Sequence, residues 1–94
     1  MTATVTREVA ETADLSLRNV AAAASRDEYA FAVGFAGTAH GLAYGTEAQA
    51  ALERLRDVLV DRMRLGADSV PLAAIEGVYD TAKMALAYVT DEVL

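Results

Sequence analysis

A stretch of seventeen residues without a single charge, Tyr29–Gly45, most constrains how this chain can fold. It reads YAFAVGFAGTAHGLAYG and contains four of the six glycines, both phenylalanines and the only histidine. A helix that is apolar on every side lies either inside a protein or inside a bilayer. As a helix, seventeen residues span about 25 Å, which is short of the ~30 Å hydrocarbon layer of a membrane. We therefore expect a buried helix over about residues 26–44.

The small residues of this helix fall on two stripes when they are placed at 100° per residue, one of alanines and one of glycines. Gly37, Gly41 and Gly45 are spaced four residues apart, and Gly34 lies on the same stripe. Each glycine inside a helix costs about 1 kcal/mol relative to alanine, and close approach of a neighbouring backbone is the usual compensation. That neighbour belongs either to this chain or to a second copy.

Three amphipathic segments accompany the apolar helix. They cover about residues 4–24, 47–65 and 69–93, and each places apolar side chains on one face and charged side chains on the other. The sequence therefore predicts an all-α fold, in which residues 1–94 form a single helical domain. We expect a four-helix bundle-like arrangement, with the three amphipathic helices wrapped around the apolar one.

Short motifs mark the predicted helix ends. Ser25–Glu28 reads SRDE and Thr46–Gln49 reads TEAQ, and both match the capping box at the start of a helix. Gly45 and Gly66 follow the second and third helices, where glycine commonly ends a helix.

Composition limits the classes of function. Fourteen acidic residues against eight basic ones give a net charge of −6, which argues against binding to nucleic acid or to an anionic membrane. The absence of cysteine excludes disulfides, thiolate catalysis and cysteine-ligated metal sites. No basic segment followed by an apolar one opens the sequence, so we expect a cytoplasmic protein. Abundant alanine, with arginine in place of nearly all lysine, indicates a bacterial or phage genome.

Few residues are suited to catalysis or to ligand binding. One histidine and surface-patterned carboxylates do not supply a nucleophile, a base and an orienting group, so we predict no enzymatic activity, no metal and no cofactor. His40 shares a stripe with Tyr29 and Tyr44, either as a packed, hydrogen-bonded side chain or as part of a small-ligand cleft. Arg62 lies within the apolar face of the third helix. It either extends to water at the helix C-terminus or binds a buried acid or an anionic ligand.

Six residues, Leu65–Val70, read LGADSV and resemble the attachment motif of acyl carrier proteins. In that family the serine opens a helix and carries 4′-phosphopantetheine, so the resemblance implies a prosthetic group on Ser69 that carries acyl chains. The layout departs from the family, because only twenty-five residues follow Ser69 and Pro71 stands close to it. Asp68 or Ser69 is alternatively the cap of the fourth helix, with Pro71 in its first turn.

The surplus of apolar helix surface predicts self-association. Three helices with one apolar face each have difficulty enclosing a fourth that is apolar all round. Twofold dimers are the commonest solution. We expect the interface to use either a ridge or a groove of the apolar helix: Phe31, Phe35 and Leu42, or Gly34, Gly37 and Gly41. The expected function is a non-enzymatic protein–protein interaction module, such as a regulator, an adaptor or a phage accessory protein, with itself and another protein as candidate partners.

Overall fold

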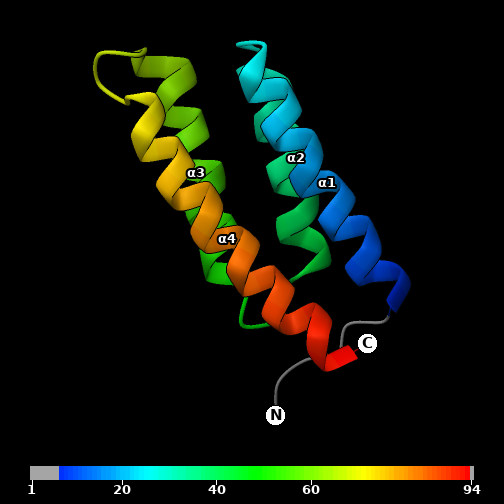
Figure 1. The fold of residues 1–94 in the computed structure, drawn as a ribbon. Coiled ribbons are helices and arrows are strands. Elements are labelled where there is room, and N and C mark those ends of the chain that lie inside the picture. The colour runs from blue at the N-terminus through cyan, green and yellow to red at the C-terminus, as the bar shows by residue number, and fades with distance from the viewer. Residues whose placement is uncertain (1–6, 94) are drawn as a thin grey trace.

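The computed structural model describes residues 7–93, with side chains up to residue 89, and this part of the chain forms four helices and no strand (Figure 1). The helices are α1 (Arg7–Ser25), α2 (Tyr29–Leu42), α3 (Gln49–Leu65) and α4 (Leu72–Val93). Successive helices run in opposite directions, because each connection is short (Figure 1). The all-α, bundle-like fold is confirmed.

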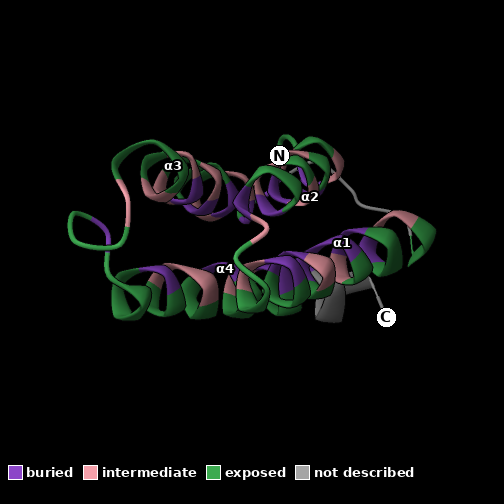
Figure 2. Ribbon diagram, turned by 90° about the horizontal axis from the view of Figure 1, so that it is seen from above, coloured by how far each residue is buried: buried purple, intermediate pink, exposed green. Residues whose placement is uncertain are grey.

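The four helices form two layers, with α2 and α3 in one and α1 and α4 in the other (Figure 2). Each helix packs against two neighbours, and over residues 7–93 α2 makes no contact with α4. The predicted position of the apolar helix at the centre of the bundle is therefore wrong. It occupies one corner of a ring of four. No helix within residues 7–93 has both the length and the hydropathy to cross a bilayer.

The core fills the space between the layers. Its largest fully buried side chains come from α1 and α3, namely Leu17, Val20, Leu52, Leu55 and Leu59. Besides the buried Tyr29, α2 and its C-cap residue Ala43 contribute a stripe of small side chains, all 0–1% exposed: Ala32, Ala36, Ala39 and Ala43. Because alanine adds only a methyl group, the leucines of the neighbouring helices pack close to the α2 backbone.

The turn from α1 to α2 is made without glycine. Asp27 adopts a left-handed conformation with φ 57°. The amide of Glu28 donates to the carbonyl of Ala23 at 2.9 Å, and the amide of Asp27 donates to that of Ala24 at 3.1 Å. This pair of bonds is the Schellman ending of a helix, in which an aspartate takes the place of the usual glycine.

The capping box predicted at Ser25–Glu28 is not formed. Ser25 is the last residue of α1, and its hydroxyl donates to the carbonyl of Ala22 at 2.7 Å. Glu28 makes no side-chain cap and instead pairs with Arg26 at 3.0 Å. Ser25, Arg26 and Asp27 therefore belong to the end of α1, and Glu28 is the N-cap residue of α2 without a side-chain cap.

The turn from α2 to α3 uses the predicted residues with a different pairing. Gly45 has φ 81°, as a glycine at a helix end allows. The Thr46 hydroxyl donates to the carbonyl of Ala43 at 2.6 Å and accepts from the amide of Ala48 at 3.2 Å. The Gln49 side chain accepts from the amide of Gly45 at 2.8 Å, one residue earlier than a capping box requires. Both side chains stabilise the turn, and α3 begins at Gln49.

The connection from α3 to α4 follows Gly66, which ends α3 with φ 87° as predicted. The fourth helix begins at Leu72 rather than at residue 69. Pro71 explains the difference, because proline disfavours the helical conformation in the residue before it. Asp68 and Ser69 consequently lie in an exposed turn ahead of the helix.

Candidate interaction surface on α2

One side of α2 faces solvent and carries no charge (Figure 2). We define the outer face of α2 by its exposed residues within the helix, which are Ala30, Phe31, Gly34, Thr38 and Gly41. Phe31 is 63% exposed, although burying an aromatic ring is strongly favourable. The Thr38 hydroxyl donates to the carbonyl of Gly34 at 3.1 Å, so its hydrogen bond is made within the helix. The outer face of α2 is thus apolar, smooth and uncharged.

The predicted aromatic ridge is only partly available on this face. Phe35 and Leu42 are half-buried and pack against the core, while Phe31 projects into solvent. Phe31 is therefore the member of the ridge that a partner would cover most completely.

The glycines of α2 do not make a close contact with another helix of the described residues. A Cβ added to Gly34 or Gly41 would meet no atom within 4 Å, and one added to Gly37 would meet only Cδ of Arg56 at 4.0 Å. Of the two neighbours expected for the glycine stripe, the one in the same chain is therefore wrong for these positions. The alanine stripe on the opposite side takes that role, and contact with a second copy stays a prediction.

His40 lies near the end of α2, against α3. Its Nε2 atom is 3.8 Å from Oε2 of Glu53, and its ring meets that of Tyr44 edge to face at 6.4 Å. Nε2 is buried and accepts or donates no hydrogen bond. The side chain is packed, and Nε2 is not the atom that supplies the hydrogen bond of the packed alternative within the described residues.

Tyr29 and Arg62 meet at the other end of α2. The guanidinium carbon of Arg62 lies 5.0 Å from the centroid of the buried Tyr29 ring. Nη1 of the same side chain donates to the carbonyl of Val70 at 2.9 Å. Arg62 therefore ties α3 to the start of α2 and to the loop before α4. No ion pair with an acid is among its contacts within the described residues.

The four candidate ligand residues consequently do not form one cleft. Tyr29 and Arg62 lie at one end of α2, and His40 and Tyr44 at the other, about three turns away. Placing residues at 100° intervals gives only their angular position around the helix, so it does not reveal this separation along the helix axis. Anion binding at Arg62 stays a prediction, although its guanidinium already binds a carbonyl.

Ser69 is exposed in the turn before α4. The family that the LGADSV motif resembles places this serine at the start of a helix, whereas α4 starts three residues later at Leu72. Attachment of a prosthetic group to Ser69 stays a prediction.

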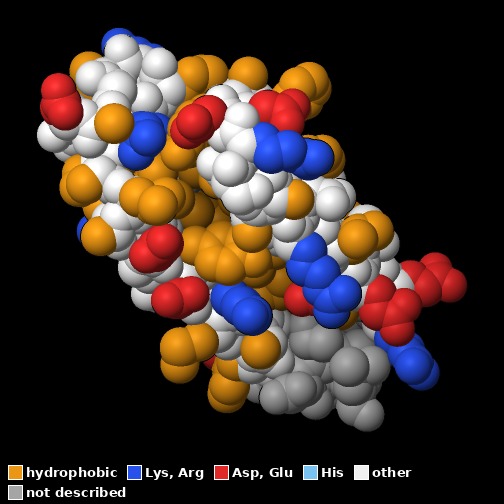
Figure 3. All heavy atoms as spheres, turned by 45° about the horizontal axis from the view of Figure 1, so that its top comes forward, with side chains coloured by type: hydrophobic (Ala, Val, Ile, Leu, Met, Phe, Trp, Pro, Cys, Tyr) orange, Lys and Arg blue, Asp and Glu red, His pale blue; other side chains and the backbone are white. Residues whose placement is uncertain are grey.

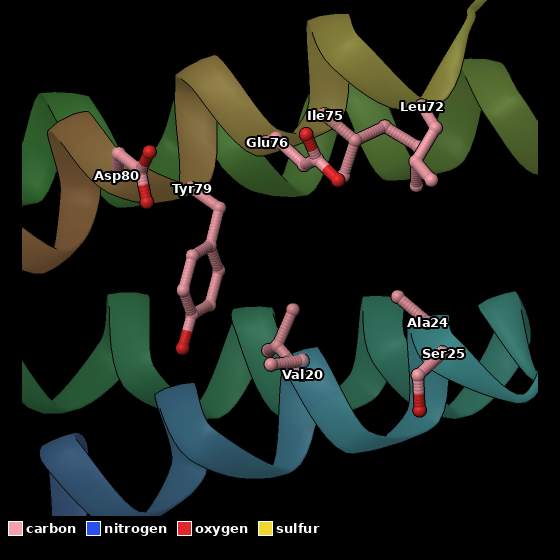
Figure 4. Close-up of a pocket in the computed structure, with 9 residues that line it drawn as sticks. Val20, Ala24, Ser25, Leu72, Ile75, Glu76, Tyr79 and Asp80 are labelled. Carbon is pink, nitrogen blue, oxygen red and sulfur yellow. The ribbon is translucent and has the colours of Figure 1, made fainter.

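Sequence reasoning missed a groove between the second half of α1 and the first half of α4 (Figure 4). It has a volume of about 360 Å³. Tyr79 reaches from α4 toward α1, and Val20 points into the groove from the other side (Figure 4). The available signal was the pair of small residues Ala21 and Ala24 on α1, which leave room opposite Leu72 and Ile75.

Comparison of the chain with protein-family models, curated proteins and solved structures finds no match.

Proposed function

We propose that this protein is a non-enzymatic interaction module that pairs with a second copy of itself through the outer face of α2. One observation carries the proposal: an exposed Phe31 lies on the same face as Gly34 and Gly41, where an added Cβ would meet no side chain and no other helix of the described residues within 4 Å. Each of these glycines weakens the helix by about 1 kcal/mol, and no close helix contact among the described residues offsets that cost. The role as a regulator, adaptor or phage accessory protein, and the cytoplasmic location, belong to the same proposal.

The outer face of α2 is complementary to itself. Phe31 is a projection, and Thr38 and Gly41, together with the half-buried Gly37 beside them, form a low surface on the next two turns. In an antiparallel pair with its twofold axis near Gly34, each Phe31 lies level with the partner's Gly37. Both Phe31 rings are then buried in the same contact. Burial of its remaining exposed area lets each ring contribute about 1–2 kcal/mol to association.

Charge favours this face over the others. Two copies that each carry −6 repel one another at most orientations. Residues 29–45 contain no charged side chain, so contact there brings together no like charges. The proposal therefore includes stronger self-association at higher salt, because salt screens the remaining repulsion.

Sedimentation velocity at tens of micromolar protein tests the proposal. The wild-type chain is expected to sediment as a dimer, and Phe31→Ser as a monomer with an unchanged helical circular-dichroism spectrum. Leu15→Ser is the matched control, because Leu15 is 57% exposed on α1, outside the proposed contact. A wild-type monomer at every concentration, or equal weakening by the two substitutions, would contradict the proposal.

A further inference from the structure

The groove between α1 and α4 is apolar at its floor. Val20 and Ile75 are buried there, and Leu72, at the start of α4, is 53% exposed at its rim. The space-filling view shows hydrophobic side chains along a hollow between the two helices (Figure 3). The groove is thus an apolar surface that residues 7–89 leave accessible.

The α4 side of this groove is acidic. Glu76 and Asp80 line it one turn apart, and neither forms an ion pair with a described residue. No basic residue lines the groove. The nearby Arg18 is already bound to Asp14 at 2.9 Å. Two unpaired carboxylates beside an apolar floor favour a ligand that is both apolar and positively charged.

Tyr79 agrees with this electrostatic picture. Burial raises the pKa of its hydroxyl, and the charges of Asp14 and Asp80 raise it further, against a smaller opposing effect of Arg18. The hydroxyl therefore stays neutral and adds no charge of its own at neutral pH.

A second hollow, between α3 and α4, provides the contrast. Its lining includes Arg54 and no acid: Ala51, Arg54, Ala73, Ala74, Gly77, Val78 and Thr81. Of these two hollows, the groove between α1 and α4 is the one that combines an apolar floor with an acidic rim.

We propose that the α1–α4 groove binds one amphipathic helix of a partner protein, with apolar anchors flanked by lysine or arginine. The α4 wall from Leu72 to Asp80 is about 12 Å long, or two helical turns, which matches anchors spaced at i, i+4 and i+7. Its walls are two antiparallel helices, so a third helix continues the packing of the bundle. The net charge of −6 steers a basic partner toward this surface. This site does not include the outer face of α2 proposed for self-association, since no residue of α2 lines the groove.

The test titrates the full chain with two helical peptides of about eighteen residues that share leucine anchors at i, i+4 and i+7. One carries lysines beside the anchors and the other carries glutamates at the same positions. Calorimetry is expected to give the lysine peptide at least a tenfold lower Kd. Amide chemical-shift changes are expected to centre on Val20, Ala24 and Ile75.

Variants locate the contact. The double substitution Glu76→Gln, Asp80→Asn keeps the shape of both side chains and is expected to weaken the lysine peptide about tenfold. Glu47→Gln, Asp61→Asn removes the same charge from exposed positions outside the groove, and is expected to leave Kd within about twofold. Ala24→Leu fills the groove and is expected to abolish binding, with circular dichroism confirming the fold.

Three results would overturn the proposal: equal affinity for the two peptides, shift changes centred away from the groove, or equal weakening by both double substitutions. Binding of octylammonium without binding of the lysine peptide would also overturn it, because the groove would then take a small cationic amphiphile. Repeating the titration with Phe31→Ser separates the result from self-association.

Discussion

The inner face of α2, which is the buried alanine stripe, and the outer face of α2 are both rich in small residues, but one is buried and the other is exposed. The inner alanines are inaccessible to solvent and let the neighbouring helices pack closely. Two outer glycines, Gly37 and Gly41, have the same four-residue spacing, but a Cβ added to Gly34 or Gly41 would meet no side chain and no other helix of the described residues within 4 Å. Alanine has a small side chain and the highest helix propensity, whereas glycine has no side chain and weakens the helix. Regular spacing of small residues therefore predicts close packing but does not identify the neighbouring element. Glycines that no described element covers favour a contact with a second molecule.

Enlarging the inner face should have the largest effect. Ala36→Leu adds three carbons at a position that is 0% exposed, where the core has no room for them. We expect the free energy of unfolding to fall by about 3 kcal/mol. Urea denaturation at low protein concentration measures it. An unchanged midpoint would show that the inner face is not closely packed.

Removing the contact that Arg62 makes with Tyr29, at the start of α2, should have a smaller effect. Arg62→Met removes the hydrogen bond to the carbonyl of Val70 and the contact with the ring of Tyr29. We expect a loss of about 1–2 kcal/mol in unfolding free energy, since the Val70 carbonyl loses its partner. Arg64→Met, at an exposed position of the same turn, is the control and should change stability by less than about 0.5 kcal/mol. Equal effects would mean that Arg62 contributes only a solvated charge.

Enlarging the outer face should have the smallest effect on stability, and the opposite sign. Gly41→Leu replaces a glycine whose surroundings are open, so helix propensity should raise the stability of the monomer by about 0.5–1 kcal/mol. The added side chain also fills the proposed contact surface and should weaken self-association. Thermal melts below micromolar concentration measure the first effect, and sedimentation at tens of micromolar measures the second. Destabilisation of the dilute protein would contradict the open environment of Gly41.

Much of the fold could be predicted from the sequence, because it depends on local signals. Amphipathic periodicity located three helices, and the left-handed conformations of Gly45 and Gly66 follow from glycine at predicted helix ends. The fourth helix starts three residues later than predicted, because Pro71 disfavours the helical conformation at Val70, so an Asp-Ser cap cannot lead directly into the helix.

The orientation of α2 could not be predicted, because an apolar helix offers no polar face to mark its outside. The absence of charge from Tyr29 to Gly45 was interpreted as burial on all sides, yet Phe31 and Gly34 are exposed. The pairing of Arg62 with the Val70 carbonyl was equally hidden, since backbone acceptors leave no trace in a side-chain pattern. Of the candidate site, the sequence therefore identified the helix and its residues, while the structure was needed to assign their faces.

Cysteine cross-linking tests most directly whether two copies meet at the outer face of α2, because the chain contains no cysteine of its own. An antiparallel pair with its axis near Gly34 brings the two copies of that residue within the Cα separation of about 4.4–6.8 Å that a disulfide needs. The two copies of Gly41 then lie about 21 Å apart along the helices. Under mild oxidation at tens of micromolar protein, Gly34→Cys should form a covalent dimer rapidly, whereas Gly41→Cys and Leu15→Cys should not. Equal rates for the three variants, or no dimer from Gly34→Cys, would contradict self-association through this face.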